Sequence, residues 1–201
     1  FAAETEHNVE VYFDRFAYHG ADESTVREQA AEFTTFIEDE NPTYFREMEG
    51  VAEGSSVPIE EIAMLNARWE VMYSALADEA EEVDGCTGFG IQQEVTADGN
   101  AYMGQNWDWI PPIETFVMDL RQADGPNMVM MTEAGIVGGK IGVNEHGIGM
   151  TCNGMISDSD GENPYRKPMH VRFREAMNAK RLDKAISPLI TGDRAVSANV
   201  I

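Results

Sequence analysis

The stretch EEVDGCTGFG, from Glu81 to Gly90, marks the point at which the character of the sequence changes. Before it, apolar residues recur with the 3.6-residue period of a helix. After it, short apolar runs alternate with turn residues, which is typical of antiparallel strands. The change predicts a helical segment over residues 1–85 and a strand-rich segment over residues 86–201. A further helical pattern near the C-terminus completes an α+β layered fold.

Two helices can be placed before this junction. Asp22 or Ser24 is a suitable N-cap for a helix that ends before Asn41-Pro42. A second helix is expected to begin around Pro58, because proline is favoured in the first helical turn. Their apolar positions are Val26, Ala30, Phe33 and Ile37 in the first helix, and Ile59, Ile62, Ala63, Trp69, Met72, Tyr73 and Leu76 in the second.

Apolar runs separated by turn residues predict antiparallel strands after the junction. Asp98-Gly99 indicates a hairpin with a two-residue turn, and Glu145-His146-Gly147 indicates a second hairpin. Residues 168–181 return to a helical pattern. The expected strands are 87–95, 101–109, 115–121, 128–132, 140–144 and 148–153, and residues 195–201 read as an interrupted strand.

The formal charge of −22 is distributed unevenly. Residues 1–85 hold 22 acidic and 4 basic side chains, whereas residues 86–201 hold 14 acidic and 10 basic ones. Such a surface repels the phosphates of nucleic acid, so we expect no nucleic-acid partner. It also suggests adaptation to high salt, where screening tolerates self-repulsion. The alternative is a solvated acidic face confined to the first segment.

The ends and hydropathy of the chain give further expectations. No apolar run approaches the roughly 18 residues of a membrane span, so we expect no membrane association and a cytoplasmic location. No signal peptide is visible. The chain begins at Phe1 rather than at Met and ends within an expected strand. Both ends therefore suggest truncation.

Several patterns that hint at other chemistry are weak. GIVGGKIG, from Gly135, lacks the Ser or Thr that follows the lysine of a phosphate loop, so its glycines are better explained by a hairpin. DSDGEN, from Asp158, has its glycine too early for a calcium loop and is better explained by a polar turn. The histidines have no metal-ligand spacing. We expect no metal and no cofactor.

Cys86 is the residue best suited to act as a nucleophile. If the bond between Gly85 and Cys86 is cut, the new α-amino group can act as the base for the thiol of the same residue. Free α-amino groups and thiols have similar pKa values, about 7.7–8 and about 8.5, so proton transfer between such groups is nearly balanced. Glycine at position 85 suits cleavage, because it adopts strained conformations freely. The alternative is a buried structural cysteine. Cys86 and Cys152 can form one disulfide or none, and we favour two free thiols.

Asp108 lies in GQNWDW, on the strand expected to return toward Cys86. There it could bind the new amino terminus or a polar part of the substrate. A two-residue turn at Asp98-Gly99 would pair residue 86 with residue 111 and leave Asp108 on the opposite face. A three-residue loop or a bulge would place Cys86 and Asp108 on one face, and this interpretation requires one of the two.

These motifs together resemble the isopenicillin-N N-acyltransferase family. More broadly, they are similar to the cysteine N-terminal-nucleophile (Ntn) hydrolases, which include choloylglycine hydrolases and penicillin V acylases. The resemblance covers essentially the whole chain and is most specific over residues 104–153. The matching segments are LNARWE from Leu65, DGCT at the junction, MGQNWDW, MMTEAGIVGGKIGVNEHGIGMTCN and RAVSANVI.

The resemblance implies an αββα four-layer sandwich and a precursor that cuts itself between Gly85 and Cys86. The products would be an acidic helical leader, residues 1–85, and the N-terminal part of a catalytic chain, residues 86–201, which stay associated. By resemblance, Cys86 is the nucleophile and Asp108 steadies its amine. Asn153 contributes to the oxyanion hole, and further active-site residues are expected beyond Ile201.

The activity implied is hydrolysis or transfer of an acyl group from a linear amide or an acyl thioester. Gln105 stands where choloylglycine hydrolases have an arginine, which argues against bile conjugates as substrates. Gly88 replaces a hydroxyl residue of the penicillin acyltransferase, which argues against β-lactam biosynthesis. The main alternative is a catalytically inactive fragment or paralogue with a structural or interaction role. A weaker alternative is an acidic cation-binding module.

Overall fold

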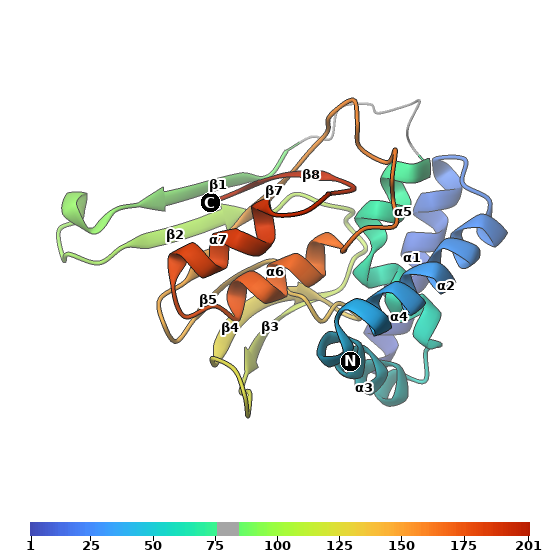
Figure 1. The fold of residues 1–201 in the computed structure, drawn as a ribbon, viewed down its shortest axis with the longest axis horizontal. Helices are drawn as coiled ribbons and strands as arrows, with labels where there is room; N and C mark the ends of the chain where they lie inside the picture. Colours follow the sequence, from blue (N-terminus) through green and yellow to red (C-terminus); the bar gives the residue numbers. More distant parts are fainter. Residues whose placement is uncertain (76–84) are drawn as a thin grey trace.

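The structure, a computed structural model, describes residues 1–75 and 85–201. Within these residues, a helical segment is followed by antiparallel strands and two further helices, which confirms the α+β class. Figure 1 shows the first helices gathered at one end of the strands, with the β1–β2 hairpin reaching away from them. No helix among the described residues is long and apolar enough to cross a membrane.

The first segment forms α-helices, as its periodicity predicts. Asp22 is an N-cap, because its side chain accepts a hydrogen bond from the Ser24 main-chain N–H at 3.1 Å. The single helix expected from Pro58 is two helices that meet at Ala67. Leu76 and the acidic residues from Glu79 to Asp84 lie outside the described residues. The helices are α1 (Ala2–Tyr18), α2 (Glu23–Glu40), α3 (Pro42–Ser55), α4 (Ile59–Asn66) and α5 (Arg68–Ala75).

The strands of the second segment pair in three antiparallel sheets. One is the β1–β2 hairpin, one has the order β3-β4-β5-β6, and one pairs β7 with β8. Figure 1 shows α6 and α7 lying over the strands, on the side that faces the viewer. The bounds are β1 (Thr87–Ile91), β2 (Tyr102–Asn106), β3 (Thr115–Leu120), β4 (Met128–Glu133), β5 (Ile141–Asn144), β6 (Gly149–Met150), β7 (Cys152–Met155), β8 (Ser197–Val200), α6 (Met169–Met177) and α7 (Leu182–Ile190).

The first hairpin differs from the expected one at its turn. Residues 92–101 join β1 to β2 and include a short 3₁₀ helix, Gln93–Val95, so the hairpin is confirmed but its connection is longer than a two-residue turn or a three-residue loop. The strand register pairs Thr87 with Asn106, which places residue 86 opposite residue 107 when it is extended by one position. The loop uses the Thr96 hydroxyl, which donates to the main-chain carbonyl of Asn100 at 2.8 Å.

The strand expected over residues 148–153 is interrupted. β6 pairs with β5 across the turn that contains Gly147, which confirms the second hairpin. At Thr151 the chain leaves that sheet, because the main-chain N–H and carbonyl of Thr151 bond to those of Ile201 at 2.9 and 3.1 Å. β7 then continues in a different sheet, beside β8.

The two segments share one hydrophobic core. Buried side chains of α1 to α5, of β4 and α6 and of the segment before β8 belong to a single cluster. Side chains of the helices approach the main chain of the second segment closely where that segment has glycine. Trp69 of α5 lies against Gly154, and Tyr44 of α3 lies against Gly138, at positions that an added Cβ would occupy. The helical segment is therefore packed directly onto the strands.

Candidate functional site

Cys86 lies immediately before β1 and is partly buried. Its thiol is free, as is that of Cys152, in agreement with the expectation of two free thiols. The Cys86 Sγ donates to the main-chain carbonyl of Asp108 at 3.6 Å. A Cβ added at the neighbouring Gly85 would meet no described atom within 4 Å. The structure thus gives no local steric reason for glycine at position 85.

Asp108 approaches Cys86 through its main chain. The expectation that a loop or bulge would place both side chains on one face of the hairpin is not met by the strand pairing, whose register leaves residue 86 opposite Trp107. Asp108 instead follows the end of β2, where strand alternation no longer applies. Its side chain is exposed. The two residues are neighbours, as expected, but by a different contact.

Asn153 is joined to the same region by Gln105. The Gln105 side-chain amide pairs with the main chain of Cys152, donating to its carbonyl at 2.5 Å and accepting from its N–H at 2.9 Å. The same Gln105 Nε2 donates to Asn153 Oδ1 at 3.0 Å. Asn153 Nδ2 lies 3.6 Å from the place where Gly88 would carry a Cβ. Asn153 is therefore held beside β1 at Gly88, two residues after Cys86.

Gly88 has a packing role in this arrangement. A Cβ at this position would lie 3.0 Å from Thr151 Oγ1 and 3.2 Å from Ile201 Cδ1. Both distances are shorter than ordinary van der Waals contact, so a hydroxyl side chain here would displace its neighbours. The absence of a side chain at position 88 thus has a steric reason in this chain.

A cluster of buried charges lies beneath this region, and sequence reasoning missed it. The Glu133 side chain at the end of β4 is fully buried and accepts from Arg68 Nη2 at 2.7 Å and from the Tyr12 hydroxyl at 2.5 Å. Lys140 forms an ion pair with the same carboxylate. Arg68 also contacts the ring of the buried His170. We call Tyr12, Arg68, Glu133, Lys140 and His170 the buried charge cluster.

The protonation of the cluster follows from its burial. Burial lowers the pKa of Lys140 to about 7, and Arg68 adds to this effect while Glu133 opposes it. Burial opposes ionisation of Glu133, but Arg68 and Lys140 outweigh it and keep its pKa below the usual value. Burial and the two cations hold the pKa of His170 well below its usual value. A neutral His170 donates from Nδ1 to the Gly139 carbonyl at 3.2 Å and accepts from Arg68 at Nε2.

The cluster supports the segment that carries Asp108. Lys140 Nζ lies 3.7 Å from the centre of the Trp107 ring, an attractive cation–π contact. Trp109 Nε1 donates to the Tyr12 hydroxyl at 2.7 Å. Both neighbours of Asp108 are thus fixed by buried groups. Cys152 lies close by, and burial raises the pKa of its thiol to about 12. Cys152 is therefore protonated at neutral pH and is a poor nucleophile.

Comparison with known proteins agrees with the motifs. No family model matches the chain. The chain is 32% identical over 163 residues to the "acyl-coenzyme A:6-aminopenicillanic-acid-acyltransferase 40 kDa form" of Emericella nidulans, an alignment that covers 80% of this chain. The chain is therefore similar to an acyltransferase over most of its own length. The similarity confirms the resemblance seen in the motifs. The alignment covers 43% of that relative's length, so the chain spans less than half of it.

The sequence carries a partial signal for the buried charge cluster. Arg68 and Glu133 stand in LNARWE and MMTEAG, two of the segments used to recognise the acyltransferase family. Apolar residues lie beside both, Ala67 and Trp69 at Arg68 and Ala134 at Glu133, and a charged residue in such surroundings is buried only when it is paired. Lys140 lies in the same matching segment as Glu133. Its partner Glu133 lies seven residues earlier, across the turn between β4 and β5.

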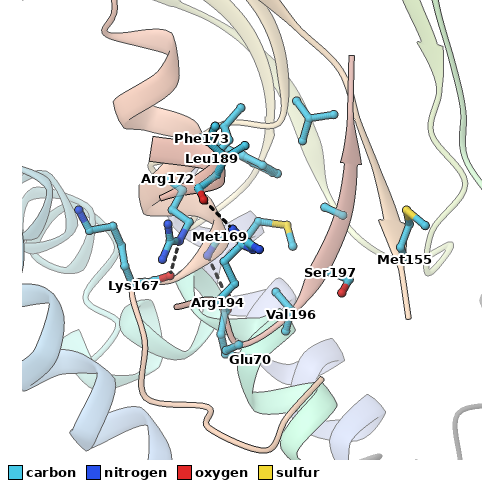
Figure 2. Close-up of a pocket in the computed structure, with 14 residues that line it drawn as sticks. Glu70, Met155, Lys167, Met169, Arg172, Phe173, Leu189, Arg194, Val196 and Ser197 are labelled. Carbon is cyan, nitrogen blue, oxygen red and sulfur yellow. Dashed lines mark hydrogen bonds between the residues drawn. The ribbon is translucent and has the colours of Figure 1, made fainter. Parts of the chain in front are cut away.

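A cavity of about 460 Å³ lies between α6, α7 and the β7–β8 sheet (Figure 2). Its lining includes Glu70, Arg172 and Arg194 among apolar side chains. Cys86, Asp108 and Asn153 are not among its lining residues. The cavity is therefore a separate feature from the residues expected in the acyltransferase site. The described residues contain no group of His, Cys, Asp and Glu side chains that could hold a metal ion.

Proposed function

We propose that the protein is a self-processing acyltransferase or amide hydrolase of the cysteine Ntn type, with Cys86 as its nucleophile. The proposed substrates are small molecules with a linear amide or an acyl thioester. The relationship to an acyltransferase supports the reaction class. The observation that carries the choice of nucleophile is the free, partly exposed thiol of Cys86 next to Gly85, at the start of β1.

Self-processing would use the thiol against the bond that precedes it. Cys86 Sγ attacks the carbonyl carbon of Gly85, and the C–N bond between the two residues breaks as the nitrogen takes a proton. That step frees the α-amine of Cys86, and water then hydrolyses the resulting thioester, which leaves a Gly85 carboxylate and restores the thiol. The contact from the thiol to the Asp108 carbonyl holds Sγ near the start of β1.

Turnover would then use the amine as the base. The α-amine of Cys86 takes the thiol proton, and Sγ attacks the acyl carbon of the substrate to form a thioester. The protonated amine returns its proton to the leaving amine or thiol. Water or an acceptor amine completes the cycle. Asn153 is the proposed donor to the developing oxyanion, and loss of one such donor typically costs about 10²–10³ in rate.

Further features belong to the same proposal. We assign the three sheets and their helices to an αββα sandwich. We also propose that the two products of cleavage stay together, because Tyr12 and Arg68 come from the helical segment and Glu133, Lys140 and His170 from the other. Separation would leave buried charges unpaired, which is costly. High-salt adaptation and a cytoplasmic location are likewise proposed.

The test is intact mass spectrometry of the full-length protein and its Cys86→Ala variant. We expect the wild-type protein to release a fragment that ends at Gly85, and the variant to remain a single chain without acyl transfer or hydrolysis. Cys152→Ala is the matched control and should still be cut. Cleavage of the Cys86→Ala variant would exclude Cys86 as the processing nucleophile.

A catalytically inactive protein is the second candidate. The observation that favours it is the contact of Cys86 with the Asp108 main chain rather than with its carboxylate. This alternative expects the wild-type protein to stay uncut after prolonged incubation and to release no acyl product from amide or thioester substrates. The same mass measurement therefore separates the two candidates.

A further inference from the structure

The cavity of Figure 2 combines apolar walls with basic side chains. Its volume of about 460 Å³ is within the range of small-molecule sites, roughly 300–1,000 Å³. The apolar walls come from α6, α7, β7 and β8 and the segment before β8. They include Met155, Met169, Phe173, Leu189, Val196 and Val200.

Arg172 supplies a fixed positive charge to this cavity. Its guanidinium donates to the main-chain carbonyls of Lys167, Pro188, Thr191 and Asp193 at 2.6–3.1 Å. No carboxylate among the described residues forms an ion pair with it. Its hydrogen-bond partners are therefore neutral carbonyls, and the carboxylates of Glu175 and Glu70 act on it only at longer range. Because its hydrogen bonds hold the loop after α7 in place, Arg172 is a structural cation rather than a free ligand-binding group.

Arg194 adds a second cation beside Arg172, and Figure 2 shows both side chains at the same cavity. Arg194 Nη1 donates to the Ile190 carbonyl at 3.0 Å, and no described carboxylate pairs with its guanidinium. Burial lowers the pKa of Arg172, and the charge of Arg194 lowers it further. Two like charges thus repel each other at the edge of an apolar space, and an anion placed there would relieve the repulsion.

The remaining charged groups at the cavity do not neutralise this excess of positive charge. Lys167 is paired with Glu175 at 2.7 Å. Glu70 is 1% exposed, accepts from the Met169 N–H at 2.8 Å, and its other oxygen has no hydrogen-bond partner among the described residues. Burial raises the pKa of Glu70 to about 7. At and below neutral pH, much of the Glu70 population is uncharged and the two arginines dominate the field.

We propose that this cavity binds an apolar monocarboxylate, with the carboxylate at Arg194 and the hydrocarbon chain against the Met, Phe, Leu and Val side chains of the walls. An apolar amine would meet two arginines and only one carboxylate, that of the buried Glu70. A multiply charged anion would be disfavoured, because some of its charges would be desolvated against apolar walls. A single carboxylate on a hydrocarbon chain satisfies both the guanidinium and the walls.

Calorimetric titration with octanoate, 1-octanol and octylamine tests the site at pH 7. The titrations use the Cys86→Ala protein, so the outcome does not depend on the proposed catalytic function. We expect one site for octanoate, binding about tenfold weaker for 1-octanol because its head group has no charge to pair, and no binding of octylamine.

Variants locate the site and identify the cation. Arg194→Met should weaken octanoate about tenfold and leave 1-octanol unchanged, while Arg194→Lys should retain most of the octanoate affinity. Arg181→Met is the control, because Arg181 is exposed and does not line the cavity. Ala198→Phe, which fills part of the cavity, should abolish binding of both molecules.

Three results would overturn the proposal. One is the absence of octanoate binding to the folded protein. The second is an unchanged octanoate affinity in both Arg194→Met and Ala198→Phe, which would place any binding elsewhere. The third is octylamine binding as tightly as octanoate. Near-UV circular dichroism of each variant confirms that the protein compared is folded.

Discussion

Lys140 carries an ammonium group into the interior, where it shares one carboxylate with Arg68. Burial is the larger influence on this lysine and lowers its pKa to about 7. In the unfolded chain, lysine has its usual pKa of about 10.4. Between these values the unfolded state binds more protons than the folded state. Stability due to this residue therefore rises with pH across that window.

The first prediction concerns this slope. In the wild-type protein we expect the Lys140 contribution to the free energy of unfolding to rise by up to about 1.4 kcal/mol per pH unit between pH 7.5 and 9. Lys140→Met should remove this rise, since methionine does not titrate. Urea denaturation at a series of pH values measures it, and Lys180→Met serves as the control because Lys180 is exposed. Equal slopes in wild type and Lys140→Met would contradict the assignment.

Gly88 and Gly85 lie in one motif but differ in the space around them. At Gly88 the neighbours Thr151 and Ile201 leave no room for a Cβ, whereas at Gly85 no described atom lies within reach of one. The sequence places both glycines near Cys86 but contains no information about which is crowded. Crowding depends on residues more than 60 positions away, whose approach is a property of the fold.

At the scale of the elements, Gln105 joins the first hairpin to β7. The hydrogen bonds come from its side-chain amide and not from main-chain strand pairing. Two go to the main chain of Cys152 and one to the side chain of Asn153. These contacts are the described hydrogen-bonding link between β2 and the strand that carries Asn153. Gln105 thus helps to hold Asn153 beside β1, together with the pairing of β7 and β8.

The second prediction tests this link. Gln105→Leu leaves the N–H and carbonyl of Cys152 without their partner, so we expect a loss of about 1–3 kcal/mol in the free energy of unfolding. Gln92→Leu is the matched control, because Gln92 is exposed in the loop of the same hairpin. Urea denaturation compares the two variants. A loss no larger for Gln105→Leu than for Gln92→Leu would show that the bonds to Cys152 contribute little.

Elements with a strong local pattern were predicted well. The helix capped by Asp22 follows from its apolar period and its cap, and the expected strands 115–121 and 128–132 are close to β3 and β4. The errors arise where distant contacts decide. Thr151 ends β6 because it pairs with Ile201, and the loop 92–101 is organised by the Thr96 and Asp98 side chains. Neither contact leaves a periodic signal.

For the candidate site too, some features could be predicted from the sequence and others could not. Cys86, Asp108 and Asn153 were recognised from motifs, and the structure places Asp108 beside Cys86 and Asn153 beside β1. The contact of Asp108 through its carbonyl could not be foreseen, because it depends on the chain direction after β2 ends. The buried charge cluster was missed because Arg68 and Glu133 are 65 residues apart and belong to different segments.

At the scale of the whole molecule, charge opposes compactness. The net charge of −22 is concentrated in the segment that forms the first helices. Self-repulsion of such a surface destabilises the folded state, and salt screens it over a Debye length of about 10 Å at 0.1 M. The exposed acidic positions on these helices include Glu28, Glu32, Glu38, Glu49 and Glu53.

The third prediction follows from this charge. We expect the melting temperature to rise between 0.1 and 2 M KCl at pH 7.5, because salt relieves repulsion among the acidic side chains. A variant with the five exposed glutamates changed to lysine should show a much smaller rise, which separates screening from general salting-out. Differential scanning calorimetry provides the measurement. An equal rise in both proteins would refute the role of repulsion.

Glu133 receives Arg68 and Tyr12 from one side of residue 85 and Lys140 from the other. This sharing bears on the timing of the proposed cleavage. A polypeptide that started at Cys86 would have to bury a carboxylate and an ammonium before their remaining partners arrived. In the proposed processing, the helical segment is synthesised first and is present when the strands collapse. Cleavage between Gly85 and Cys86 would then be a late event, after the interior has closed.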